Sequence, residues 1–553
     1  MSRVISAEAP SGSRSLPPVL SRLMRGTFWL ALRTPLQVVF AFWSIPLMIH
    51  AIGDLYGAYG FAWGFGFLQM LMEFGMSSAL QRQVSDSWTR GDRAGVDRAI
   101  ACGMHFYAAM AVIQAAALLA IAYFGVPASF GPQGISLIVK LLWLQAVTAP
   151  VYGISAIINS VLQAARRYEI VPRLEMLVVV LRFAILWGGL RLGVDFFLIV
   201  VAQTALAIGL TLGPALWVMA RELDYLPRFR RARLADFAPL LHISVYMAMI
   251  QLSVVLADRI DTTVLGYALT GDPKPGIVVY QAVSKPFFMI RQTSWTLAYL
   301  VMPAVASLAA ARDERGLERV KYDGPRFLIG LLLPLTLLAW LYAGPFLTLW
   351  IGPEMGAHAP LMRLFLVAAL PLALSVQVQM AIGLGKIEVI AIAALAGALV
   401  NLPLSYLLTR QIGVAGVIWG TVLTTLLSNL LVPGVYLFRV LGIRVRTFLA
   451  RTLSAPLSGA ATLLAATWAL RSAFSADPRI AEVVARSLPL LVRLSGGHQV
   501  IADLLVEASR AVPLLAHLGL GCLAFLAGYL AMPTGRADLS ALARKICPRR
   551  AAA

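Results

Sequence analysis

Hydrophobic residues occur along this chain in long runs separated by short polar stretches. Each run is about as long as the 18 or more residues needed to cross the bilayer core. A backbone in lipid must satisfy its own hydrogen bonds, so the pattern predicts an all-α polytopic membrane protein. The fourteen predicted helices are Thr27–Ile49, Ala58–Leu80, Ile100–Tyr123, Ile135–Leu162, Met176–Leu192, Phe196–Ala220, Leu240–Leu265, Val278–Ala306, Phe327–Leu349, Leu361–Leu384, Val389–Leu408, Val414–Leu437, Phe448–Leu470 and Val512–Met532.

Acidic positions in the short loops repeat at a nearly constant distance along the chain. The pairs are Asp54 and Asp272, Asp92 and Asp313, and Glu169 and Glu388, separated by 218, 221 and 219 residues. An even number of crossings separates the partners, so the repeat predicts two six-helix lobes in the same orientation around a central cavity. The last two helices are then an addition.

This repeat divides the chain into six predicted parts. They are a basic cytoplasmic tail (1–26), a first lobe (27–220), a cytoplasmic linker (221–239), a second lobe (240–441), two C-terminal helices (442–533) and a basic cytoplasmic tail (534–553). The C-terminal pair encloses a long outer loop, 471–510. Its apolar spacing fits amphipathic helices on the outer membrane surface, but a loosely ordered insertion fits as well.

Charge sets the orientation of the helices. The chain has 553 residues, is 59% hydrophobic and only 13% charged, and carries a net charge of +20. Its lysines and arginines gather in alternate loops and in both tails, which places both termini in the cytoplasm by the positive-inside rule. The net charge therefore does not indicate a nucleic-acid partner. The start of the chain lacks a signal-peptide pattern, and its three cysteines match no metal-ligand spacing.

Several short motifs, in order, resemble one known family. The helix-two region contains Gly53, Asp54, Tyr56-Gly57 and Glu73-Phe-Gly75. Three later stretches are ADRIDTTVLG (Ala257–Gly266), YQAVSK (Tyr280–Lys285) and NLPLSYLLTRQIGVAGVIWGT (Asn401–Thr421). From Met24 to Leu441 the chain resembles bacterial polysaccharide-biosynthesis membrane proteins of the O-antigen flippase type. Their superfamily also holds multidrug exporters and the peptidoglycan-precursor flippase.

The resemblance implies transport rather than bond chemistry. A flippase of this type moves an undecaprenyl-pyrophosphate-linked oligosaccharide across the bacterial inner membrane by alternating access. The glycan is an O-antigen, capsule or exopolysaccharide unit, and polysaccharide polymerase machinery is an expected partner. No cofactor or catalytic residue is implied, and coupling to a proton or sodium gradient stays open.

Four cations are candidates for holding the pyrophosphate. Arg182 and Arg291 lie in the middle of predicted helices five and eight, where a charge is costly unless it faces a cavity or a partner acid. Arg33 in helix one either contacts substrate or snorkels to the inner face. Lys285 lies nearer the outside, in a vestibule or on substrate. Arginine suits a phosphate because its planar fork donates two parallel hydrogen bonds.

The acidic candidates lie toward the helix ends. Asp258 and Asp261 share one face of helix seven, and Arg259 points away from it by about 100°. Helix seven starts near Leu240, so Asp258 is about 27 Å along it, in the outer third. The cluster is interpreted as a gate element, with ion coupling as the alternative. Glu73, at the inner end of helix two, either pairs with a loop arginine such as Arg82 or takes part in the same gating.

Two other functions remain open. A multidrug or organic-cation exporter of the same superfamily would need a cavity dominated by acids, whereas arginines exceed acids in the middle of these helices. A membrane glycan polymerase or ligase would need reactive groups on large outer loops. The one long outer loop, 471–510, has no recognisable catalytic constellation.

Overall fold

The protein is described by a computed structural model. It covers residues 36–37, 39–71, 73, 76–165, 167, 170–227, 237, 252–253, 256, 260–299, 301–386, 388–474 and 499–546. These residues form helices joined by short turns, and no strand occurs among them. The predicted all-α fold is confirmed.

The chain forms two compact units. The first contains Met1–Ala41, Gly75–Val112 and Thr148–Ser244, and the second contains Phe42–Phe74, Ile113–Val147 and Val245–Ala553. The first unit holds α4 (Met76–Thr89), α7 (Ile170–Arg191) and α8 (Phe196–Glu222), and it shares α5 (Arg93–Ala120) and α6 (Gly131–Ala164) with the second. The boundaries assigned above to the lobes, linker and C-terminal helices stay a prediction.

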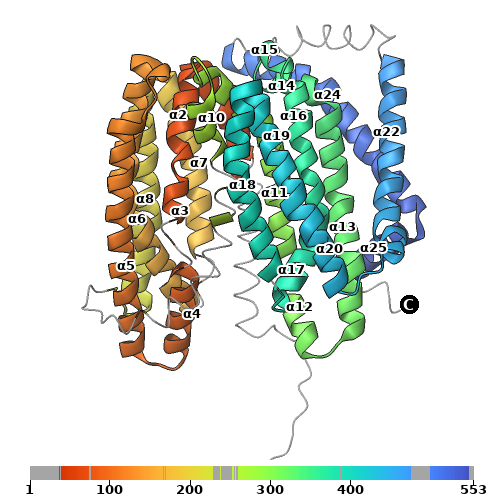
Figure 1. Cartoon of the computed structure of the whole chain (residues 1–553), viewed down its shortest axis with the longest axis horizontal. Helices are drawn as coiled ribbons and strands as arrows, with labels where there is room; N and C mark the ends of the chain where they lie inside the picture. Colours follow the sequence, from red (N-terminus) through yellow and green to blue (C-terminus); the bar gives the residue numbers. More distant parts are fainter. Residues whose placement is uncertain are drawn as a thin grey trace, which may run out of the picture. The chain divides into compact units, whose positions relative to one another are not determined.

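The second unit holds the remaining helices. They are α2 (Leu55–Gly64), α3 (Phe67–Leu71), η1 (Ile121–Gly125), η2 (Ala128–Phe130), α10 (Asp261–Ala268), α11 (Lys274–Tyr299), α12 (Val301–Ala310), α13 (Glu314–Leu341), α14 (Ala343–Trp350), α15 (Pro353–Gly356), α16 (Ala359–Leu366), η3 (Val367–Leu374), α17 (Ser375–Gly383), α18 (Glu388–Ile412), α19 (Val414–Thr425), η4 (Leu426–Leu431), α20 (Val432–Val440), α21 (Val445–Thr447), η5 (Phe448–Leu453), α22 (Ser454–Phe474), α24 (Gln499–Ala531) and α25 (Pro533–Ile546). Figure 1 shows α18 and α19 side by side, with their axes nearly aligned.

Eight helical stretches of the described chain are long and apolar enough to span a membrane. They are Arg93–Gly125, Ala128–Ala164, Phe196–Glu222, Glu314–Leu341, Ala359–Gly383, Glu388–Ile412, Val414–Val440 and Leu514–Ala531. A shorter apolar helix, Val39–Ile52, lies in the first predicted segment. The chain is therefore a multi-pass membrane protein, and the count of fourteen crossings stays a prediction.

Some predicted segments are not single helices. The second, Ala58–Leu80, is divided into α2, α3 and α4, because Phe65 and Gly66 form a turn that interrupts the hydrogen-bond ladder. The tenth contains the 3-10 helix η3 around Pro371. Hydropathy stays high across both breaks, so the apolar pattern alone does not show them. The tail assigned to 534–553 contains most of helix α25.

Backbone turns of positive φ recur at matching helix ends of the two lobes. Such angles are costly for residues other than glycine. The pairs are Gly53 (53°) and Gly271 (89°), Gly91 (73°) and Arg312 (53°), Gly131 (69°) and Gly352 (152°), Gly193 (68°) and Gly413 (63°), and Asp224 (46°) and Gly442 (60°). Each pair is separated by 218 to 221 residues, as the acidic pairs are. The parallel repeat is therefore present in the backbone itself.

The loop before helix α5 and the loop before helix α13 show the repeat in atomic detail. Asp92 Oδ1 accepts a hydrogen bond from the amide of Gly95 at 2.8 Å, and Asp313 Oδ1 accepts one from Gly316 at 2.9 Å. Each aspartate satisfies an amide that the first helical turn leaves without a backbone partner. This accounts for the recurrence of an acid at this loop position.

Each unit has an apolar interior. In the first unit, Leu80, Ile100, Leu162 and Met219 bring together α4, α5, α6 and α8. Lipid tails are as apolar as leucine, so burial in a bilayer adds little to helix association. Close packing and polar contacts between helices consequently decide which surfaces adhere, and the candidate site is built from both.

Candidate functional site

Asp261 is the acid around which the site is built. It occupies the first turn of α10, and only 1% of its surface is exposed. Its Oδ2 accepts a hydrogen bond from the hydroxyl of Tyr280 at 2.6 Å and another from Thr421 at 2.9 Å. The carboxylate therefore joins α10 to α11, the next helix in the chain, and to α19, whose Thr421 lies 160 residues further on.

Burial of a carboxylate is expensive unless donors replace its hydration. The two hydroxyl groups supply such donors, and hydrogen bonds to an ionised acceptor are stronger than neutral ones. Among the described residues, no group of three histidines, cysteines or acids could hold a metal ion.

The partners of Asp261 come from the motifs quoted above. Tyr280 opens the YQAVSK stretch, and Thr421 closes the Asn401–Thr421 stretch. The fold brings both to the ADRIDTTVLG stretch that contains Asp261. Neither residue is among the site residues that the sequence predicts, and 160 residues separate Thr421 from the acid. The sequence feature that could have identified them is that both lie in the same set of motifs as Asp261.

Helix α2 of the first lobe packs closely on α10 and α11 of the second lobe. A Cβ atom added to Gly57 would lie 2.3 Å from the carbonyl oxygen of Lys274, and one added to Gly64 would lie 2.6 Å from Thr262 Oγ1. The backbones of the two lobes therefore approach as closely as only glycine allows. We call this set of contacts the α2 contact.

Aromatic rings complete the α2 contact. Phe61 is fully buried, and its ring lies against Gly266 and stacks at a tilt on Phe130, with centroids 4.7 Å apart. A second aromatic contact involves Phe42, which precedes α2 in the chain. The indole of Trp350 donates to the carbonyl of Phe42 at 2.8 Å, and the two rings stack with centroids 4.8 Å apart. These contacts hold the described parts of the first two predicted helices against α10, α11 and α14.

The candidate cations lie in different units. Arg182 is half-buried in α7 of the first unit, and its carbonyl accepts from Gln203 of α8 at 2.7 Å. No described carboxylate pairs with the Arg182 guanidinium. Arg291 and Lys285 are half-buried in α11 of the second unit. The Arg291 guanidinium lies over the rings of Phe288 and Phe287, at 5.0 and 5.5 Å from their centroids.

The other candidates are only partly described. Glu73 is 5% exposed and lies between α3 and α4, at the break in helix two. Arg33, Asp258 and Arg259 lie outside the described residues. The structure places Asp261 on α10, which also takes part in the α2 contact. The roles proposed for all eight candidate residues stay predictions.

Comparison with known proteins gives a consistent family and fold. The model of the family described as "Polysaccharide biosynthesis protein" matches residues 23–308. The uncharacterized membrane protein EpsK of Bacillus subtilis (strain 168) is 31% identical over 188 residues, which is 33% of this chain and 36% of that protein. The match thus spans about a third of this relative's length.

Solved structures share the fold at low sequence identity. An inward-facing multidrug resistance MATE family transporter of the MOP superfamily superposes with a TM-score of 0.62 at 13% identity, over 73% of this chain and 94% of its own. The lipid II flippase MurJ in an inward closed conformation gives 0.61 at 12%, over 78% and 92%. The family match covers more than half of the chain, so this multi-pass membrane protein belongs to the polysaccharide biosynthesis family and has the fold of the MOP superfamily.

Proposed function

We propose that this chain is a flippase that carries an undecaprenyl-pyrophosphate-linked oligosaccharide from the inner to the outer leaflet by alternating access. Family membership supports polysaccharide biosynthesis as its setting, and the fold is one that transporters use. The bacterial inner membrane, with both termini in the cytoplasm, is the proposed location. The polymerase machinery that consumes the glycan is a proposed partner.

The observation that carries the proposal is the α2 contact. It joins the two lobes through glycine backbones and aromatic rings. The topology prediction places these helix ends outside. The α2 contact then serves as an outer gate, which closes while the substrate enters from the inside and opens to release it.

Asp261 gives the gate a site for ion coupling. A proton or cation that neutralises this buried carboxylate weakens its charge-assisted bonds to Tyr280 and Thr421. The two hydroxyl groups lie on α11 and α19, so the charge on Asp261 changes how tightly α10 is held in the second lobe. We propose that this change accompanies gate opening.

The cations favour an anionic substrate. Arg182 and Arg291 lie within apolar helices, where each guanidinium is retained at a cost of roughly 2.5–3.5 kcal/mol. A pyrophosphate offers a guanidinium in such a setting charge-assisted hydrogen bonds. An exporter of organic cations has the buried Asp261 and the likeness to the MATE transporter in its favour. Transport of an organic cation by the purified protein, and not of a polyprenyl-pyrophosphate glycan, would support that alternative.

The decisive experiment follows the lipid-linked glycan in cells. A strain without this protein should accumulate the glycan on the inner leaflet of the membrane, and the intact gene should restore its export. Normal surface polysaccharide without any accumulation would contradict the proposal. Mass spectrometry of the accumulated lipid would identify the sugar.

A further inference from the structure

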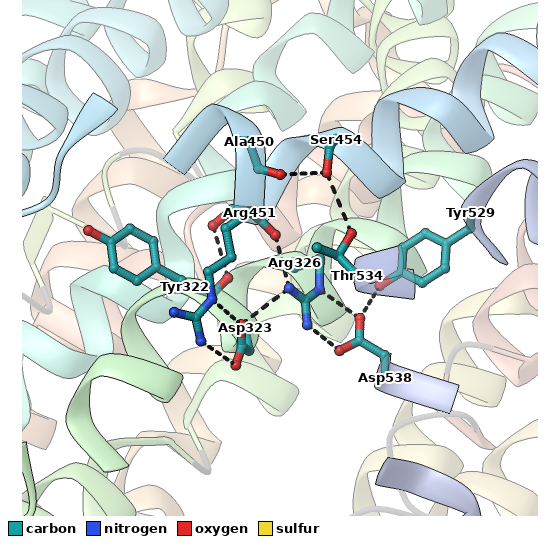
Figure 2. Close-up of polar contacts among 10 residues, drawn as sticks. Tyr322, Asp323, Arg326, Ala450, Arg451, Ser454, Tyr529, Thr534 and Asp538 are labelled. Atoms are coloured by element: carbon teal, nitrogen blue, oxygen red, sulfur yellow. Dashed lines mark hydrogen bonds and ion pairs between the residues drawn. The ribbon is translucent and has the colours of Figure 1, made fainter. Parts of the chain in front are cut away.

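A buried polar cluster lies where α13 of the second lobe meets the C-terminal helices. We define the Arg326 cluster as Tyr322, Asp323, Arg326, Arg451, Tyr529 and Asp538 (Figure 2). Its members come from α13, η5, α24 and α25. The side chain of Arg326, at its centre, is 5% exposed. None of the functions considered so far uses these residues.

The Arg326 guanidinium binds three partners at once. Its Nε donates to Asp538 Oδ2 at 2.7 Å, and its Nη2 donates to Asp538 Oδ1, so the fork grips this carboxylate through both oxygens. Its Nη1 donates to Asp323 Oδ1 at 3.2 Å and to the carbonyl of Arg451 at 2.9 Å. Four hydrogen bonds therefore replace the hydration that burial removes.

The second arginine closes the cluster on its other side. Arg451 donates from Nε and Nη2 to the two oxygens of Asp323, both at 3.0 Å, and its guanidinium lies 5.5 Å from the ring of Tyr322. Arg451 belongs to the π-helix η5, whose wider turn interrupts the regular i to i+4 bonding. Its carbonyl is thereby available to Arg326.

Helices α24 and α25 are joined to the cluster through Asp538. The hydroxyl of Tyr529, near the end of α24, donates to Asp538 Oδ2 at 2.6 Å. Each of the two aspartates is therefore bound by an arginine fork. Removing one partner would leave a buried charge without its counter-charge, which is strongly destabilising.

Close packing continues the attachment along α13. A Cβ atom on Gly521 of α24 would lie 2.8 Å from Leu338 Cδ2, and one on Gly330 would lie 2.8 Å from the ring of Tyr529. Leu338, Phe525 and Tyr529 also share one buried apolar cluster. The C-terminal helices thus adhere to α13 both through glycine contacts and through the charges.

The repeat shows that the cluster belongs only to the lobe that carries extra helices. The distance of 221 residues that relates Asp92 to Asp313 places Cys102 opposite Asp323 and His105 opposite Arg326. His105 contacts the carbonyl of Ala101 on its own helix. The first lobe therefore has neither the acid nor the arginine at these two positions.

We propose that the Arg326 cluster locks α22, α24 and α25 onto α13, so that the C-terminal helices move with the second lobe as one body. The inference rests on the proposed alternating-access cycle. During that cycle the first lobe moves against a second lobe that is enlarged by the C-terminal helices. The C-terminal helices then do not act as a separate gate.

Cross-linking tests the shared movement. In a chain with Cys102, Cys522 and Cys547 replaced by serine, Leu338→Cys with Gly521→Cys is joined by a short bifunctional thiol reagent. The assay follows a fluorescent short-chain polyprenyl-pyrophosphate disaccharide across vesicles that contain the full chain. We expect this cross-link to leave the transport rate within about twofold of the rate of the untreated protein.

A matched cross-link supplies the control. The pair Phe42→Cys and Trp350→Cys is joined in the same way. This cross-link ties the first predicted helix to α14 of the second lobe and should stop transport. If the Leu338–Gly521 cross-link stops transport as well, while the melting temperature is kept, the shared movement is overturned. If the untreated protein moves no substrate, the proposed function fails, and the stability test below still examines the lock.

Thermal unfolding of the full chain in detergent tests the lock itself. Arg326→Gln and Asp538→Asn should each lower the melting temperature by several degrees, and the double variant should lose no more than the worse single one. Asp86→Asn removes an exposed ion pair with Arg90 and should change nothing. Additive losses, or no loss in either single variant, would overturn the lock.

Discussion

At the scale of single residues, the behaviour of Asp261 depends on its two hydroxyl partners. Position along helix seven predicts an acid in the outer third, but not that it is buried or bonded to Tyr280 and Thr421. The contact with Thr421 depends on how α10 packs against α19, which follows it by 160 residues. The pattern of a single segment contains no information about that packing.

Replacement of Asp261 tests its coupling role. Asp261→Asn keeps the shape of the side chain and removes the charge that a proton or cation would neutralise. We expect transport in vesicles to lose its response to an imposed proton or sodium gradient, whereas the protein still inserts and folds. Thr424→Ser, which keeps a hydroxyl bonded within its own helix, is the control. Unchanged gradient dependence in Asp261→Asn would contradict ion coupling at this site.

The arginines of α7 and α11 test the anionic substrate. Arg182→Ala and Arg291→Ala should each abolish surface-polysaccharide export, because each removes a charge proposed to hold the pyrophosphate. Lysine at either position should retain part of the activity if charge alone matters, since it lacks the planar fork. Membrane levels of the variants are measured alongside. The Arg90→Ala variant, which changes an exposed arginine, should export the polysaccharide normally. Wild-type export in both Arg182→Ala and Arg291→Ala would refute the proposal that these arginines hold an anionic substrate.

At the scale of elements, the second predicted helix shows that the apolar pattern alone does not reveal where a helix breaks. Its residues read as one continuous segment, yet they form α2, α3 and α4. Gly57 and Gly64, in its first part, allow α2 to approach α10 and α11. Glycine spacing was visible in the sequence, but the surface that it faces becomes apparent only when the second lobe is in place.

The α2 contact predicts a strong effect from one methyl group. Gly57→Ala places a Cβ atom 2.3 Å from the carbonyl oxygen of Lys274, which is backbone and cannot rotate away. We expect the gate to stay open and transport to be lost. A cysteine at Ile277, which is fully buried against Gly60, should then react with a membrane-impermeant maleimide.

A glycine with open space around it provides the control. Gly188→Ala, within α7, meets nothing within 4 Å and exchanges a poor helix former for a good one. Transport and labelling should stay at wild-type levels in this variant. If Gly57→Ala behaves as Gly188→Ala does, the α2 contact is not a gate.

At the scale of the whole molecule, the fold class, the parallel repeat and the family were predicted from the sequence. Three pairs of acids were enough to detect the repeat, and the matching turns confirm it. The family match begins one residue before Met24, where the resemblance starts. The attachment of the C-terminal helices was not predicted, because Arg326 and Asp538 are 212 residues apart and Asp538 lies in the C-terminal addition, which the repeat does not include.

Orientation is the remaining prediction at this scale. A reporter that is active only in the cytoplasm should work when it is fused after residue 553. A tag placed between α22 and α24, within the predicted outer loop 471–510, should be reached from outside intact cells. The excess of lysine and arginine in the inner loops is the physical reason. Activity of the reporter within that loop would reverse the proposed topology.

The matched turns also bear on how the chain arose. At two of the five positions the copies differ: Arg312 stands opposite Gly91, and Asp224 stands opposite Gly442. A positive φ is tolerated far better by glycine, so glycine is the residue under which each turn could first have formed. Each half therefore lacks glycine at one of the five turns, as is expected of two copies that changed independently after a duplication.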